Sequence, residues 1–237
     1  MWMQPPVTYI EPVFRPPTEQ DSLILQVTNG CSWNKCSFCE MYTEPHKKFR
    51  PKAEDEVLAE IQRCGALNMD VKRVFLADGD PLVLSFKRLE TILLAIREHL
   101  PSVQQVSAYG LAQNVKNKTP EELQRLRELG LSLVYLGAES GSNTVLRKVN
   151  KSETFDSTLE ALLKLKAAGI QTFVMIINGL GGNVYSQEHA LESARLINAA
   201  QPDYLATLRL FFQNNPKRFF ESFGDDYVPS DDLDVLH

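Results

Sequence analysis

The sequence lacks the features of a membrane, secreted or nucleic-acid-binding protein. No apolar run approaches the roughly 20 residues that a membrane helix needs, and the longest runs, such as Phe173 to Ile177, have the length of a strand. The N-terminus shows no basic head followed by an apolar stretch, so we predict no signal peptide and no membrane association. The net charge of −5 does not favour nucleic acid as a partner, although it says nothing against a substrate carried on RNA. We therefore expect a cytoplasmic protein.

Metal-binding side chains are also scarce, but some of them are clustered. The four histidines are scattered along the chain, at positions 46, 99, 189 and 237, which predicts no histidine metal triad. Of the four cysteines, three lie within nine residues, at Cys31, Cys36 and Cys39. Cytosolic thiols stay reduced, so this grouping predicts metal ligation rather than a disulfide framework.

The 237 residues suit one domain, in which short apolar runs alternate with amphipathic segments. We predict strands at 23–28, 72–77, 104–108, 132–137, 170–177 and 203–210, and helices at 53–67, 84–98, 120–129, 155–168 and 186–199. This alternation is typical of parallel βαβ units with right-handed crossovers. Six such strands form either an open doubly wound sheet or part of a barrel, and periodicity alone favours neither.

Two flanking segments depart from this pattern. Residues 1–22 hold five of the 13 prolines, which predicts an extended N-terminal segment before a core at 23–212. Residues 213–237 form a C-terminal extension. Its last eight residues, 230–237, begin like a capped amphipathic helix and stop after about two turns, a length at which isolated helices are marginal. This helix either docks on the core or belongs to a truncated chain.

Polar residues and glycines gather where the predicted strands end. The second strand runs into Asp78-Gly79-Asp80-Pro81, the third ends near Ser107, the fourth near Glu139 and the fifth at 178–182. The first strand leads directly into the three cysteines. Ligands of both parallel architectures bind at the carboxyl ends of the strands. The sequence therefore predicts a single site at this edge of the sheet.

The three cysteines are spaced as C-x4-C-x2-C, a pattern that suits an iron–sulfur cluster held by thiolates. A plant-type 2Fe–2S ferredoxin uses the same spacing with a distant fourth cysteine, here Cys64. However, Cys64 shares a helical face with Val57 and Ile61 and is interpreted as a core residue. A zinc site completed by His46 is another alternative, although its spacing departs from common zinc motifs. Three unrelated buried cysteines are the least specific interpretation.

The cysteine loop resembles that of the radical S-adenosylmethionine (SAM) superfamily, in which three cysteines directly follow the first strand. In that family an aromatic residue precedes the last cysteine, and Phe38 fills this position. The usual spacing there is C-x3-C-x2-C, so this chain carries one extra residue between Cys31 and Cys36. The resemblance extends over residues 23–210.

The resemblance also implies which residues contact the cofactor. Asp78, Gly79 and Asp80 stand where the family has a Gly-Gly-Glu-Pro-like turn that meets the methionine amino group. Glu139 would accept hydrogen bonds from the ribose hydroxyls. Lys151 would pair with the methionine carboxylate, at a position where many members have arginine. Ser107 occupies another position that often touches the cofactor.

In fold and chemistry, the resemblance implies an α/β protein built as a partial (β/α)6 TIM-like barrel. Cys31, Cys36 and Cys39 would hold a 4Fe–4S cluster, and SAM would chelate the iron that no cysteine binds. One electron would break the C5′–S bond of SAM, and the resulting 5′-deoxyadenosyl radical would abstract a hydrogen from the substrate. The sequence names no substrate and no reaction class.

The electron would come from a flavodoxin- or ferredoxin-type protein, and such donors are typically acidic. In this acidic chain the dense basic run of Lys47, Lys48, Arg50 and Lys52 is a candidate docking patch for the donor. A non-enzymatic iron–sulfur electron carrier or sensor with a 2Fe–2S cluster stays open as the alternative function.

Overall fold

The computed structural model describes residues 6–214 and 216–229, which form a parallel sheet of six strands covered by helices. The strands are β1 (Leu23–Gln26), β4 (Arg73–Ala77), β5 (Gln105–Tyr109), β6 (Leu131–Glu139), β7 (Gln171–Asn178) and β8 (Tyr204–Arg209). All neighbours pair in parallel, in the order β1-β4-β5-β6-β7-β8. A doubly wound sheet reverses its strand order, whereas this order follows the chain. The predicted partial TIM-like barrel is therefore confirmed.

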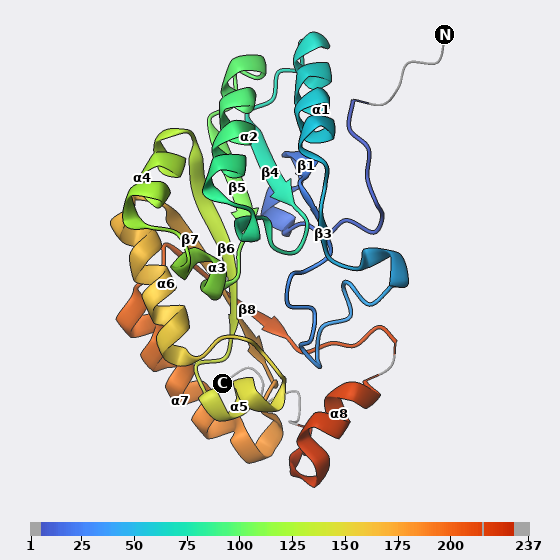
Figure 1. The fold of residues 1–237 in the computed structure, drawn as a ribbon. Helices are drawn as coiled ribbons and strands as arrows, with labels where there is room; N and C mark the ends of the chain where they lie inside the picture. The colour runs from blue at the N-terminus through green and yellow to red at the C-terminus, as the bar shows by residue number, and fades with distance from the viewer. Residues whose placement is uncertain (1–5, 215, 230–237) are drawn as a thin grey trace.

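Helices cover the outer face of this sheet, one after each of the first five strands (Figure 1). They are α1 (Glu54–Ala66), α2 (Phe86–His99), α4 (Pro120–Glu128), α6 (Phe155–Ala167) and α7 (Gly182–Ala200). Local chemistry sets their ends: Thr119 and Glu122 form the capping box that starts α4. Gly130 follows α4 with a φ of +115°, a conformation that only glycine adopts without strain.

The strands separate two apolar cores because successive side chains point to opposite faces. In β4, Val74 and Leu76 belong to the main core between sheet and helices. Phe75 and Ala77 point into the barrel, where they join Tyr135 in a second, smaller core. The interior of the barrel is therefore filled with aromatic side chains below the carboxyl edge where the site is predicted.

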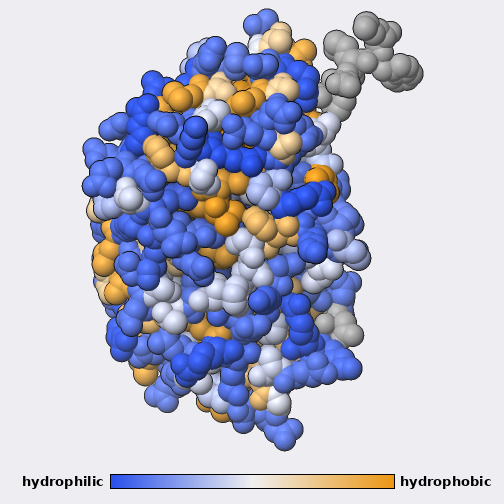
Figure 2. Space-filling view, in the orientation of Figure 1, coloured by the Kyte–Doolittle hydropathy of each residue, from blue (hydrophilic) through white to orange (hydrophobic). Residues whose placement is uncertain are grey.

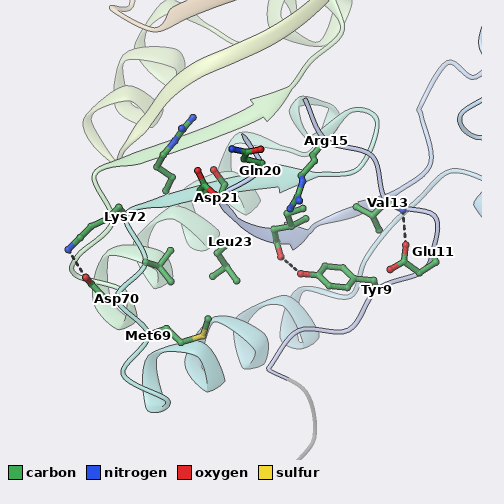
Figure 3. A pocket seen from close by; sticks show the side chains of 14 residues that line it. Tyr9, Glu11, Val13, Arg15, Gln20, Asp21, Leu23, Met69, Asp70 and Lys72 are labelled. Atoms are coloured by element: carbon green, nitrogen blue, oxygen red, sulfur yellow. Dashed lines mark hydrogen bonds and ion pairs between the residues drawn. The ribbon is translucent and has the colours of Figure 1, made fainter. Parts of the chain in front are cut away.

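The N-terminal segment runs along the edge strand β1 and closes the amino end of the barrel. The Tyr9 hydroxyl donates to the Ile24 carbonyl at 3.0 Å (Figure 3). Glu19, in a 3₁₀ turn, lies fully buried below the strands. A hollow of about 760 Å³ between this segment and the start of β1 and β4 is lined by residues that include Arg15 and Lys72 (Figure 3). It lies at the end of the barrel opposite to the three cysteines.

Several short elements were not expected from the sequence. They are β2 (Thr28–Asn29), β3 (Arg50–Pro51), α3 (Ala112–Lys116), α5 (Asn143–Lys148) and α8 (Lys217–Phe223). None is longer than seven residues, too short for a periodic pattern to stand out. The helix predicted at 230–237 lies outside the described residues.

On the face seen in Figure 2, hydrophilic side chains predominate and apolar residues appear in small separate groups, as is normal for folded proteins. Within residues 6–214 and 216–229, no helix has the length and apolar character to cross a membrane.

Candidate functional site

The cysteine loop leaves the sheet after β1 and is closed at its base by backbone pairing. Strands β2 and β3 pair antiparallel, with Asn29 opposite Arg50. The Asn29 amide nitrogen donates to the carbonyls of His46 (2.8 Å) and Lys48 (3.1 Å). At Gly30 the φ is +71°, and a Cβ would lie 2.1 Å from the Lys47 carbonyl, so only glycine fits. The loop of about twenty residues is thus held in one conformation.

The three thiols of this loop line one cavity of about 260 Å³ at the carboxyl end of the barrel. Cys31, Cys36 and Cys39 are all partly buried and carry no disulfide. Burial raises the pKa of each thiol, that of Cys36 to about 12. Uncompensated thiolates are therefore disfavoured here, and a bound cation is what would deprotonate them.

The donor set and shape of the cavity fit an iron–sulfur cluster. Sulfur ligands are those that such clusters use, and three of them face one space. Gly79 also lines it, and a Cβ there would come within 2.9 Å of the Cys31 Cβ and 2.6 Å of the Tyr42 ring. Across the described part of the chain, no three His, Cys, Asp or Glu side chains converge on a single metal ion.

Cys64 and His46, the fourth ligands of the two alternatives, lie elsewhere. Cys64 is fully buried among the apolar side chains of the main core, as predicted. The His46 ring nitrogen Nε2 lies 2.7 Å from the Glu11 carbonyl of the N-terminal segment. Neither residue lines the cavity that holds the three thiols.

Glu139 and Lys151 line the same cavity as the thiols. Glu139 ends β6 with a φ of +63°. A Cβ at Gly137 would lie 2.0 Å from the Glu139 Oε1 atom, so a larger residue there would displace the Glu139 carboxylate. The Lys151 Nζ atom lies 3.6 Å from Glu139 Oε1 and 3.7 Å from Glu153 Oε2. These distances are longer than those of a direct hydrogen bond. Glu139 and Lys151, which line the cavity, are therefore able to contact a ligand.

The charges of this group depend on one another. Burial raises the pKa of Glu139, and the Lys151 ammonium opposes that rise. Burial lowers the pKa of Lys151, but Glu139, Glu153 and the nearby thiols outweigh it and raise the pKa above its usual value. Lys151 therefore carries its charge beside the three cysteines.

The Glu153 carboxylate is a member of this group that sequence reasoning missed. It is 3% exposed, and neither of its carboxylate oxygens accepts a hydrogen bond within the described residues. Only its position just before Thr154, the N-cap of α6, could have drawn attention to it.

The Asp78–Asp80 turn at the end of β4 contacts the cysteine loop from below. Asp78 Oδ2 forms a fully buried ion pair with Lys47 Nζ at 2.5 Å and accepts from the Gly30 backbone N–H at 3.4 Å. Asp80 Oδ2 accepts from Ser32 Oγ at 2.5 Å. The two carboxylates therefore hold the residues immediately before and after Cys31. Both are fully buried, and neither lines the cavity.

Further contacts fix Asp80 in place. Its Oδ1 accepts from the Leu111 backbone N–H at 3.2 Å, and its Oδ2 accepts from the Asn114 amide at 2.5 Å. Burial raises its pKa to about 6, although these donors and Ser32 act in the opposite direction. The carboxylate is thus occupied by the protein's own donors.

Phe38 and Ser107 lie in different places. Phe38 lines the cavity and packs against a separate apolar cluster that includes Val145 and Phe219. Ser107, expected at the end of its strand, instead lies in the middle of β5, fully buried. Its hydroxyl donates to Glu19 Oε1 at 2.9 Å, near the closed amino end. The structure therefore separates Ser107 from the thiols.

The basic run is divided between the interior and the surface. Lys47 is fully buried in its pair with Asp78, and Lys52 pairs with the buried Glu60 at 2.6 Å. Lys48 and Arg50 are exposed. The prediction of a docking patch of all four side chains is therefore wrong, because Lys47 is buried against the Asp78 turn and Lys52 against α1.

Comparison with known proteins identifies the family. The chain is 20% identical over 171 residues to the heme chaperone HemW of Bacillus subtilis, covering 69% of this chain and 45% of that protein. It is 28% identical over 180 residues to the anaerobic magnesium-protoporphyrin IX monomethyl ester cyclase of Cereibacter sphaeroides, covering 76% of this chain and 28% of that protein. The chain thus spans less than half the length of these relatives.

Solved structures show the same fold. Coproporphyrinogen III oxidase (HemN) of Escherichia coli, described as a radical SAM enzyme, superposes with a TM-score of 0.65 at 18% identity, over 91% of this chain and 50% of that one. Methylornithine synthase (PylB) gives a TM-score of 0.61 at 19% identity, over 91% of this chain and 60% of that one. The sequence model of the radical SAM superfamily matches residues 25–197, from β1 through most of α7. With nearly three quarters of its length matched, the chain belongs to the radical SAM superfamily.

Proposed function

We propose that this chain is a radical SAM enzyme whose Cys31, Cys36 and Cys39 hold a 4Fe–4S cluster. Members of the superfamily use such a cluster together with SAM. The observation that carries the proposal is that the three thiols share one cavity with the Glu139–Lys151 pair. Because Cys64 is buried in the core, one iron would have no cysteine ligand and could bind SAM.

When bound, the cluster and SAM would supply the chemistry: one electron cleaves SAM and yields a radical that abstracts a hydrogen from the substrate. The chain's own residues would bind and orient the cofactor. Lys151 would pair with the methionine carboxylate, and Glu139 would accept hydrogen bonds from the ribose hydroxyls. Phe38 would pack beside them, and Gly79, which has no side chain, would leave room for the cofactor.

A reactive radical must be shielded from side reactions, and the cavity has side chains that could do so. Beyond Glu139 and Lys151, its wall on the barrel side consists largely of apolar and aromatic groups, including Tyr135, Met175 and Leu208. In this proposal Asp78 and Asp80 serve the cofactor indirectly, by holding Gly30 and Ser32 on either side of Cys31.

The alternative, an electron carrier or sensor, is less well supported. Such a protein needs a cluster but no groups for an organic ligand. A carboxylate and a lysine beside the thiols are what binding of a zwitterionic cofactor requires. As the electron source we propose a flavodoxin- or ferredoxin-type protein, and as the location the cytoplasm, where free thiols persist.

Formation of 5′-deoxyadenosine tests the proposal. The protein is reconstituted anaerobically with iron and sulfide, reduced with dithionite and given SAM, and the product is measured by mass spectrometry. We expect product from the wild type and from Cys64→Ala, the matched control. Cys31→Ala, Cys36→Ala and Cys39→Ala should each lose bound iron and product. Loss in Cys64→Ala with retention in Cys31→Ala would overturn the ligand assignment.

A further inference from the structure

The chain after β8 returns to the cysteine loop, and this return lies outside the residues that the family model matches. The match to the radical SAM family ends at residue 197, whereas α8 comprises Lys217–Phe223. Figure 1 shows α8 apart from the layer of helices that covers the barrel. Its contacts are therefore a property of this chain beyond the matched core.

Residues 213–214 and 216–227, here called the C-terminal segment, contact the second half of the loop at several positions. The Arg218 guanidinium donates to the carbonyl oxygens of Cys36 and Cys39, the latter at 3.3 Å. The Ser222 and Ser37 hydroxyl oxygens lie 3.0 Å apart. Two backbone N–H groups, at residues 213 and 214, donate to a Glu40 carboxylate oxygen at 2.7 and 3.3 Å.

The C-terminal segment is itself anchored on the barrel. Phe219 and Phe223 are buried in one apolar cluster with Val145 and Leu180. The Tyr227 hydroxyl donates to the Gly179 carbonyl at 3.1 Å. Arg218, although exposed to solvent, therefore projects from a packed helix toward the loop.

Arg218 joins the carbonyls of two proposed cluster ligands. The Cys39 N–H already donates to the Cys36 carbonyl at 3.2 Å, which forms a turn between them. The carbonyl oxygens carry partial negative charge, and a guanidinium with several donors in a plane can satisfy both. Arg218 thus fixes the Cys36–Cys39 turn and places a positive charge beside it.

Given the cluster of the proposed function, we propose that Arg218 positions the Cys36–Cys39 turn and raises the reduction potential of the cluster. Reduction adds one electron from the donor to the oxidised cluster and makes it one unit more negative. A nearby positive charge stabilises the reduced state relative to the oxidised state. Net charge and hydrogen bonding around a cluster are general means by which proteins set its potential.

A potentiometric titration followed by paramagnetic resonance tests this inference. The holoprotein is compared with Arg218→Ala, Arg218→Lys and the control Lys217→Ala. Lys217 lies on the same helix, is 73% exposed and pairs with Glu221 at 3.6 Å, so its replacement removes a charge from α8 while Arg218 stays in place. At the potential that half-reduces the wild-type cluster, Arg218→Ala should lower the reduced-to-oxidised ratio about two- to tenfold. A tenfold change corresponds to about 59 mV for one electron.

The other variants make the result specific. Arg218→Lys keeps the charge but replaces the planar guanidinium by a compact ammonium on a flexible stem, which holds the two carbonyls less firmly, so its ratio should lie between wild type and alanine. Lys217→Ala should match the wild type. If Arg218→Ala binds no cluster, Arg218→Lys alone tests the inference. Its reduced-to-oxidised ratio must then be lower than that of the wild type. Equal ratios in wild type and the Arg218 variants would overturn the inference. A wild type that binds no cluster would instead overturn the proposed function.

Discussion

Two turns that carry acidic residues, at the carboxyl ends of β4 and β6, serve different purposes in the fold. The turn after β4 directs Asp78 and Asp80 into the protein, where Lys47 and Ser32 bind them. At the end of β6, Glu139 faces the cavity, and its ion-pair partner among the described residues is Lys151, at 3.6 Å.

The difference teaches how to distinguish a positioning carboxylate from a binding one. Both turns lie where a barrel binds ligands, so location alone does not separate them. What separates them is whether protein donors already occupy the carboxylate. By that criterion Asp80, with three donors, holds the loop, and Glu139 is available to a ligand.

The largest effect, on the free energy of unfolding, is expected when the contacts of the β4 turn are removed. Lys47→Met leaves the Asp78 carboxylate buried without its cation, which should lower the free energy of unfolding by about 3–5 kcal/mol. Urea unfolding of the cluster-free protein measures this. Lys48→Met, at an exposed neighbouring position, is the control and should change stability by less than about 0.5 kcal/mol. Equal losses in the two variants would contradict the assignment.

The next effect is a pH dependence that belongs to Asp80. Its folded-state pKa is raised from 3.8 to about 6, so the folded protein binds the proton more tightly than the unfolded chain. Its contribution is favourable below about pH 4 and is lost as the pH rises to about 6, at roughly 1.4 kcal/mol per pKa unit.

Comparison with Asp80→Asn isolates that contribution. The difference in unfolding free energy, wild type minus variant, should fall by about 3 kcal/mol between pH 4 and pH 7. Urea unfolding at several pH values in that window gives the curve. A difference that stays constant with pH would show that Asp80 does not titrate as described.

A smaller effect is expected at the β6 turn, on binding rather than folding. Glu139→Gln in the cluster-loaded protein should weaken SAM binding by about 1.5–3 kcal/mol, or roughly 10- to 150-fold. Because Glu153 still pairs with Lys151 in this variant, its unfolding free energy should change less than that of Lys47→Met. Asp80→Asn should keep SAM affinity within a few-fold, because its side chain does not line the cavity. Calorimetric titration of both variants with SAM measures this. A larger loss of SAM affinity in Asp80→Asn than in Glu139→Gln would contradict the comparison.

The smallest effect concerns electron delivery. Of the basic run, Lys48 and Arg50 are exposed. Replacing both with glutamine should slow reduction by an acidic flavodoxin about two- to fivefold at low salt, and less at high salt. Lys72→Gln, at the opposite end of the barrel, is the control. Stopped-flow rates that are the same for both proteins would remove this surface as a docking site.

Regular elements could be predicted from the sequence because their periodicity is local. All six strands and all five long helices appear where apolar spacing indicated, and α6, Phe155–Ala167, matches 155–168 within one residue. The three cysteines and Glu139 also meet at one cavity, because parallel strands bring their ends together.

Contacts between distant segments could not be predicted. The pairing of Lys47 with Asp78 joins residues 31 positions apart, and the contact of Arg218 with Cys36 joins residues 182 positions apart. No local pattern marks such pairs. Ser107 was misplaced for a related reason: its strand continues to Tyr109, so the serine points toward Glu19 instead of the site.

The central claim, a cluster with one iron open to SAM beside Glu139 and Lys151, is tested most directly by paramagnetic resonance of the reduced protein. Spectra of anaerobically reconstituted wild type are recorded with and without SAM, at matched reduction. We expect a 4Fe–4S signal whose g values change when SAM is added, with a weaker response in Glu139→Gln at the same SAM concentration. A 2Fe–2S signal, or a spectrum that SAM leaves unchanged, would contradict the account.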